Sequence, residues 1–128
     1  METKELMQFD WVCLENDPTP RQVDFIRTGE VGLYYNRIAT PSNIKPILLT
    51  PEILEKNGWT YNNEDEKFFP QTWVGGGLML QSTNGGYGIV VTSDYDDEDT
   101  NATPFLIFYV HELQHALRLR RINKEIVL

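Results

Sequence analysis

The stretch Tyr109–Leu128, YVHELQHALRLRRINKEIVL, decides how the end of the chain folds and carries its clearest chemical pattern. Residues 110–121 contain no Pro or Gly and are rich in Leu, Ala, Gln and Arg, which predicts a helix. Within this helix, residues 111–115 spell H-E-x-x-H. In zinc peptidases the two His of this motif bind one metal ion from successive turns, and the Glu activates the bound water. The motif therefore raises His111 and His115 as metal ligands, and Glu112 as a catalytic base.

A catalytic zinc site also needs a third protein ligand. The chain has 2 His, so this ligand would have to be Asp or Glu. After His115 the sequence offers Glu125, which follows too closely for the downstream ligand of a zinc peptidase. The acidic run Asp94–Asp99 precedes a predicted strand, Phe105–Val110, whose length separates it from the helix by roughly 20 Å. We therefore expect no metal, no cofactor and no catalytic residue, and keep a zinc site as the alternative.

The composition indicates one acidic globular domain, or one domain with two lobes. The chain has 128 residues, of which 41% are hydrophobic, and its net charge is −8. Up to Val110 there are 7 Lys and Arg against 17 Asp and Glu, whereas the remainder has 4 against 2. This acidity disfavours direct binding to nucleic acid. A single Cys13, no apolar N-terminal leader and no apolar run of membrane-spanning length predict a cytoplasmic protein without a membrane anchor. Oligomeric state is not predicted.

The first part of the chain, residues 1–58, predicts a small β-barrel or meander followed by a short helix. Phe9–Leu14, Gln22–Arg27 and Val31–Tyr35 read as short strands, and the turn cluster Asn16–Pro20 separates the first two. Residues 36–43 are polar and predict a loop, and residues 44–49 predict an extended segment. A helix follows, with Thr50 as N-cap, Pro51 at its first position and Asn57-Gly58 at its end.

The second part, residues 59–128, predicts a three-stranded antiparallel sheet with the C-terminal helix packed on it. Leu78–Ser82 and Tyr87–Ser93 flank Asn84-Gly85, which is a strong hairpin signal, and Phe105–Val110 is apolar on both faces. Residues 59–72 predict an irregular loop or a weak strand pair. The predicted fold class is therefore α+β, with two lobes or one compact domain.

The acidic loop between the last two strands is the candidate interaction surface, through Asp94, Asp96, Asp97, Glu98 and Asp99. Its alternating carboxylates resemble the start of a calcium loop. However, the sixth position is Asp99 where such a loop needs Gly, and the twelfth is Phe105 where it needs Glu. A solvated loop is one interpretation. The other is an acidic surface that occupies a partner's basic, nucleic-acid-binding groove.

Three segments together resemble a family of small proteins from gut Bacteroides-type bacteria and their phages and mobile elements. They are Trp11-Val12, IKPILLTPEILEKNGW at residues 44–59, and YVHELQHALRL at residues 109–119. The family has no known activity. The resemblance implies that relatives carry Gln or Asn at the positions of Glu112 and His115. It thus implies that the match to the H-E-x-x-H zinc motif is incidental and that the helix is retained for packing.

Three hypotheses of function follow. The first is a non-catalytic binding protein, such as a phage or mobile-element accessory factor in the host cytoplasm, that engages a host protein through its acidic surface. The second is a zinc-dependent hydrolase that uses His111, His115 and Glu112. The third is a protein that sequesters a small ligand in a pocket between the barrel and the sheet.

Overall fold

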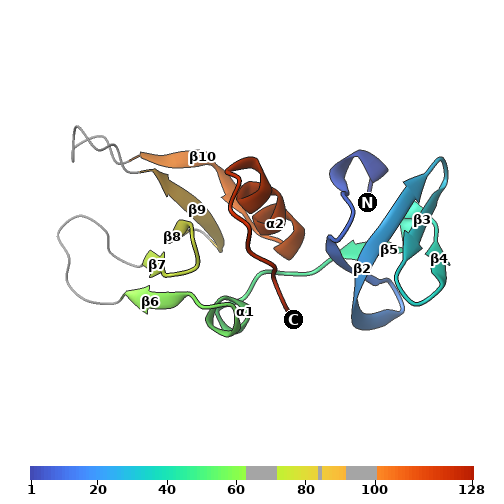
Figure 1. Ribbon diagram of the computed structural model, residues 1–128, viewed down its shortest axis with the longest axis horizontal. Helices are drawn as coiled ribbons and strands as arrows, with labels where there is room; N and C mark the ends of the chain where they lie inside the picture. The colour runs from blue at the N-terminus through green and yellow to red at the C-terminus, as the bar shows by residue number, and fades with distance from the viewer. Residues whose placement is uncertain (63–71, 84, 92–100) are drawn as a thin grey trace. The chain divides into compact units, whose positions relative to one another are not determined.

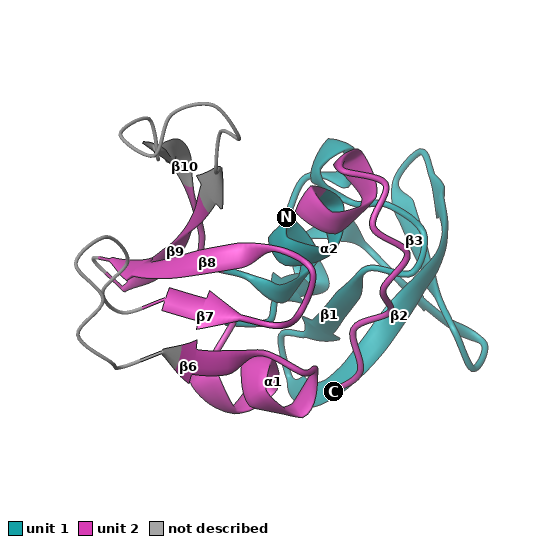
Figure 2. Cartoon of the chain, turned by 60° about the vertical axis from the view of Figure 1, so that its left-hand side comes forward, with its two compact units in different colours: residues 1–48, 109–115 teal, residues 49–108, 116–128 magenta. Residues whose placement is uncertain are grey.

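The computed structural model describes residues 1–62, 72–83, 85–91 and 101–128, and its fold is mixed α+β (Figure 1). Two compact units are present (Figure 2): unit 1 comprises Met1–Leu48 with Tyr109–His115, and unit 2 comprises Leu49–Phe108 with Ala116–Leu128. Unit 1 thus combines the start of the chain with the start of the C-terminal helix. No helix within the described ranges is long and apolar enough to cross a membrane.

Unit 1 contains a five-stranded antiparallel sheet in the order β4-β3-β2-β1-β5. Its elements are the 3₁₀ helix η1 (Thr3–Glu5), β1 (Trp11–Leu14), β2 (Asp17–Arg27), β3 (Glu30–Leu33), β4 (Arg37–Ala39), the 3₁₀ helix η2 (Pro41–Asn43) and β5 (Ile44–Pro46). The edge strands β4 and β5 do not pair with each other within residues 1–48, so the sheet is open. Of the two predicted alternatives the barrel is therefore wrong, and β1 to β4 pair in chain order as in a meander. Its core consists of Leu6, Val12, Leu14, Val23, Val31, Leu33, Ala39 and Ile44.

Two segments predicted as turn or loop are strands in unit 1. β2 begins at Asp17, inside the predicted turn, and contains Pro18 and Pro20. This is possible because β3 pairs with β2 only from Val23 onward, and because the pairing of β1 with β2 shifts register between Arg21 and Asp17, where the prolines lie. β4 lies inside the predicted polar loop, and its pairing with β3, as in Val31↔Ala39, sets its conformation. Pairing with a neighbouring strand therefore overrides the local pattern in both segments.

Unit 2 contains a second five-stranded antiparallel sheet, in the order β10-β9-β8-β7-β6. Its elements are α1 (Pro51–Lys56), β6 (Thr60–Asn62), β7 (Thr72–Val74), β8 (Met79–Thr83), β9 (Gly86–Val91), β10 (Asn101–Ile107) and the last part of α2 (Val110–Leu119). The predicted hairpin is confirmed, with Thr83 paired to Gly86. The predicted count of three strands is wrong, because β6 and β7 extend the sheet. The predicted acidic interaction surface, Asp94 to Asp99, lies outside the described residues.

Helix α1 begins and ends at the residues that its sequence predicts. The Ile53 N–H donates to Thr50 Oγ1 at 3.3 Å, Pro51 is the first helical residue, and Gly58 follows the helix with φ of +94°. The Asn57 side chain extends this end: its Nδ2 donates to Val127 O at 2.8 Å, and its Oδ1 accepts from Val127 N at 2.8 Å. An amide side chain thus holds the C-terminal tail in place within unit 2.

The glycine run Gly75–Gly77 has a packing role in unit 2. A Cβ at Gly76 would lie 2.0 Å from the indole ring of Trp59, which is 2% exposed and donates through Nε1 to Leu78 O at 2.8 Å. A glycine is therefore required where the backbone crosses the face of a buried tryptophan.

Candidate functional site

The N-terminus of α2 is fixed within unit 1 by backbone and side-chain hydrogen bonds. The Val110 N–H donates to Ile47 O at 2.8 Å, and Leu48 and Tyr109 form an isolated antiparallel bridge. One turn into the helix, Glu112 Oε1 accepts a hydrogen bond from the Tyr109 N–H at 3.0 Å. This is the reciprocal half of a capping box, and a carboxylate in the first turn also suits the helix dipole. Glu112, the residue predicted as the alternative catalytic base, is therefore a capping residue.

Gln114, which occupies the unspecified position before His115 in the motif, makes two hydrogen bonds to the backbone at the start of β1. It is 7% exposed, its Nε2 donates to Phe9 O at 2.9 Å, and its Oε1 accepts from Trp11 N at 2.8 Å. Its amide thus pairs with the backbone of Phe9 and Trp11, where β1 begins, as a neighbouring strand would. Phe9 itself has φ of +72°, a conformation rare for a bulky residue, and its carbonyl also accepts from Gln22 Nε2 at 3.1 Å.

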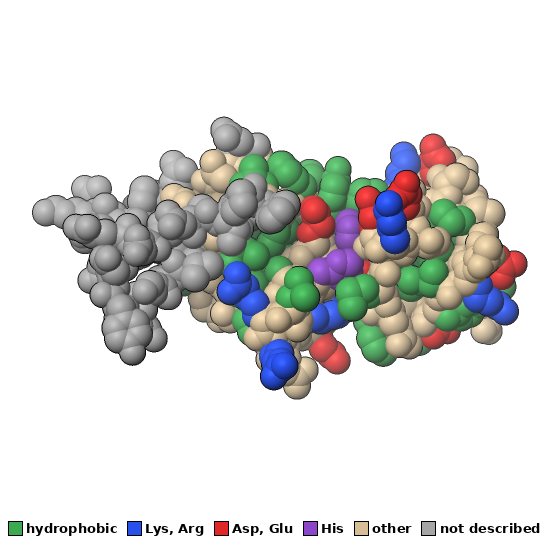
Figure 3. Space-filling model, turned by 90° about the horizontal axis from the view of Figure 1, so that it is seen from above, with side chains coloured by type: hydrophobic (Ala, Val, Ile, Leu, Met, Phe, Trp, Pro, Cys, Tyr) green, Lys and Arg blue, Asp and Glu red, His purple; other side chains and the backbone are tan. Residues whose placement is uncertain are grey.

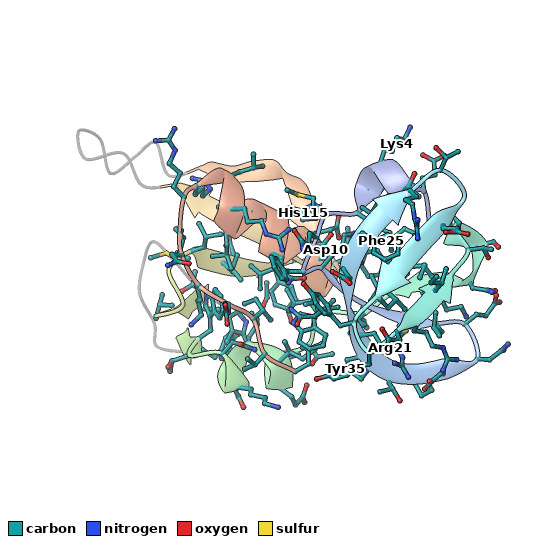
Figure 4. All side chains as sticks on the ribbon, turned by 45° about the vertical axis from the view of Figure 1, so that its right-hand side comes forward. Lys4, Asp10, Arg21, Phe25, Tyr35 and His115 are labelled. Carbon is teal, nitrogen blue, oxygen red and sulfur yellow. The ribbon has the colours of Figure 1, made fainter. Side chains whose placement is uncertain are left out.

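His115 is hydrogen-bonded to Asp10 (Figure 4): its Nε2 lies 2.6 Å from Asp10 Oδ2, although 105 residues separate the two in sequence. Asp10 is fully buried, and the same oxygen accepts from the Met7 N–H at 2.8 Å. The side chain of His115 is 25% exposed, so the pair joins a buried carboxylate to a ring that water can reach. A buried carboxylate requires such partners, because it cannot be desolvated alone.

His111 is the most enclosed ring of the motif, at 6% exposure. It stacks on Tyr109 at 5.9 Å between centroids and 11° between planes, and it meets His115 edge-on at 5.5 Å. Burial lowers the pKa of His111 below its ordinary value, against the opposing effect of the Asp10, Glu112 and Glu5 carboxylates. The ring is therefore neutral at pH 7. Its Nδ1 is buried without a hydrogen-bond partner.

A pocket of about 430 Å³ opens at these side chains within unit 1. Its lining consists of Met1, Glu5, Pro46, Tyr109, His111, Glu112 and His115. Histidine side chains are visible from outside, with acidic side chains near them (Figure 3). The α-ammonium group of Met1 is hydrogen-bonded to Pro41 O at 3.0 Å. The pocket thus combines two carboxylates, two imidazoles and a tyrosine ring.

The side chains of this site do not fit a zinc ion as they are arranged. No group of three or more His, Cys, Asp or Glu able to hold a metal occurs among the described residues. The Nε2 of His115, which would bind the metal in the peptidase motif, is hydrogen-bonded to Asp10.

Sequence reasoning missed Asp10 and Gln114. Asp10 belongs to the predicted strand Phe9–Leu14, where a single carboxylate reads as a solvated side chain, and no spacing rule links it to a helix 105 residues away. Gln114 occupies a position that the zinc motif leaves unspecified. Comparison with known proteins adds no assignment, since no family model, no curated protein and no solved structure matches the chain.

Proposed function

We propose that this chain is a non-catalytic binding protein that engages another protein through an acidic surface. Because three of its segments resemble a family of small proteins from Bacteroides-type bacteria and their phages and mobile elements, the proposed role is that of a phage or mobile-element accessory factor in the cytoplasm of a bacterial host. The supporting observation is that three polar side chains of the H-E-L-Q-H segment have structural partners. Glu112 caps α2, Gln114 holds the backbone before β1, and His115 binds the buried Asp10. Two of the three residues that would perform hydrolysis, Glu112 and His115, are therefore engaged in hydrogen bonds that hold unit 1 together.

The charge of the chain favours a basic partner. Unit 1 contains 8 Asp and Glu against 5 Lys and Arg, and unit 2 contains 11 against 6, so both units are acidic. The acidic run at residues 94–99 contributes five carboxylates to unit 2. Charge complementarity of this kind increases association rates and selects partners of opposite sign, more than it adds affinity.

The test compares capture of a host protein by two charge variants. In the first, Asp94, Asp96, Asp97, Glu98 and Asp99 are replaced by Asn or Gln. In the matched control, five exposed carboxylates elsewhere are neutralised: Glu2, Glu15, Glu30, Glu52 and Glu55. We expect the wild type and the control to capture one partner with an affinity that falls with salt, and the first variant to lose it. Equal capture by both variants refutes the assigned surface, and no reproducible partner refutes the function.

Metal content provides the independent check against the hydrolase alternative. Protein purified without a histidine tag at neutral pH should contain less than about 0.1 equivalent of zinc. A catalytic zinc site binds its metal tightly enough to retain about one equivalent through purification. Stoichiometric zinc, lost together with hydrolytic activity in Glu112→Gln, would restore the hydrolase interpretation.

A further inference from the structure

We propose that the pocket of unit 1 binds the guanidinium group of an arginine side chain presented by the partner. This inference rests on the proposed function, and it names the chemical group of the partner that the pocket of unit 1 would recognise. Its starting point is the buried His111 Nδ1, which lacks a hydrogen-bond partner although the ring lines the pocket. A buried polar atom without a partner is costly, and a ligand that supplies one removes the cost.

The charges at the pocket select a cation. Glu5 from η1 and Glu112 from α2 both line it, and their negative charges act on His111 together with that of Asp10. Burial keeps His111 neutral, so this ring adds hydrogen-bonding capacity without positive charge. The capping bond from the Tyr109 N–H leaves the negative charge of Glu112 in place. Met1 also lines the pocket, but its α-ammonium group is hydrogen-bonded to Pro41 O and is outnumbered by the two carboxylates. An anionic ligand would therefore face a net negative charge, whereas a cation would reduce it.

The shape of the lining favours guanidinium over ammonium. The Tyr109 and His111 rings are stacked within 11° of parallel, and Tyr109 is 37% exposed, so an aromatic face borders the pocket. A planar guanidinium stacks on such faces and carries five donors, whereas an ammonium is a compact, strongly hydrated charge. Met1 and Pro46 supply apolar surface for the aliphatic stem. The volume of about 430 Å³ lies within the range of small-ligand pockets.

Peptide binding to the intact chain tests this assignment. Three capped peptides, Gly-Arg-Gly, Gly-Lys-Gly and Gly-citrulline-Gly, are titrated while the backbone amide signals are followed by NMR. We expect the arginine peptide to bind most tightly and to shift the signals of Glu5 and Tyr109–Glu112, and the uncharged citrulline peptide to leave them unchanged. Each of Glu5→Gln and Glu112→Gln should weaken binding roughly tenfold, as expected for removing the charge from one hydrogen bond. Gln at position 112 can still cap the helix.

Glu30→Gln is the matched control, because Glu30 is an exposed carboxylate of unit 1 that does not line the pocket. It should bind like the wild type. Equal affinity for the lysine peptide, shifts that map away from the pocket, or no binding at 10 mM peptide (about ten times a 1 mM Kd) overturns the guanidinium assignment. If partner capture persists while the peptides fail, this inference alone is wrong. If the peptides bind while no partner is captured, the pocket stands and the proposed function fails.

Discussion

Replacing His115 by Ala should destabilise the metal-free protein, because the substitution removes a partner from the fully buried Asp10 carboxylate. Breaking a buried ionic or charge-assisted pair by deleting one member typically costs about 3–5 kcal/mol. Here the Asp10 end is 0% exposed but the imidazole is 25% exposed, so water can enter the vacated space and replace part of the hydrogen bond. The Met7 N–H also continues to donate to Asp10 Oδ2. We therefore expect a loss of about 2–3 kcal/mol, which is below the range for a fully buried pair.

The matched variant is His115→Gln, whose Nε2 lies at about the same reach as the Nε2 of His and can donate to Asp10. It should recover more than half of the loss. Urea unfolding in a chelating buffer, followed by the amide NMR signals of unit 1, gives the free energy of unfolding for each variant. With Asp10→Asn and the double variant, the same measurement yields the coupling free energy of the pair, expected at about 1.5–3 kcal/mol.

Two results would refute this reasoning. One is a His115→Ala variant within about 0.5 kcal/mol of the wild type, the usual limit for a surface substitution. The other is equal destabilisation by Ala and Gln, which would mean that ring packing, and not the bond to Asp10, stabilises the site. A zinc ligand makes the opposite prediction, since its removal would lower metal affinity and leave the stability of the metal-free chain largely intact.

Three further predictions concern two residues of unit 1 and one residue of unit 2. Gln114→Ala should lower the free energy of unfolding by about 2 kcal/mol, since it removes the hydrogen bonds to Phe9 and Trp11 at about 1 kcal/mol each. Gln114→Glu should not restore the lost stability, because a carboxylate cannot donate a hydrogen bond to Phe9 O. Urea unfolding measures both effects. Burial depresses the pKa of His111, so stability should fall as pH falls below its ordinary value of 6.5, by at most about 1.4 kcal/mol per pH unit for one proton. His111→Leu should flatten that dependence, and an unchanged pH profile would contradict it. Gly76→Ala should cost about 1–3 kcal/mol through overlap of its Cβ with the buried Trp59 ring, and thermal unfolding measures this cost. A change of less than about 0.5 kcal/mol would contradict the packing role of Gly76.

The elements that sequence reasoning predicted correctly are those whose signals lie within a few residues. Helix α1 carries its N-cap, its Pro and its terminal Gly in one segment, and the β8–β9 hairpin is specified by Asn84-Gly85. The strands β4 and β6 have three residues each and no alternating pattern, so they form only because a neighbouring strand supplies the pairing. The open sheet of unit 1 has the same origin. Three short strands with tight turns fit both a barrel and a meander, and whether β4 meets β5 is a non-local property.

The same division between local and distant information explains the candidate site. Helical spacing places His111 and His115 on adjacent turns, and their rings do lie 5.5 Å apart. What each ring does is set by its surroundings: Asp10 approaches one ring from the segment before β1, whereas burial leaves the other ring neutral. A motif defined by helical periodicity specifies relative positions on one helix, and those positions serve a metal only when another element supplies a ligand. In unit 1 the segment before β1 supplies a carboxylate, but that carboxylate is hydrogen-bonded to His115 Nε2, the atom a peptidase zinc would need. The side chains that contact the two histidines, rather than the H-E-x-x-H pattern itself, therefore distinguish a zinc site from a helix anchored to a sheet.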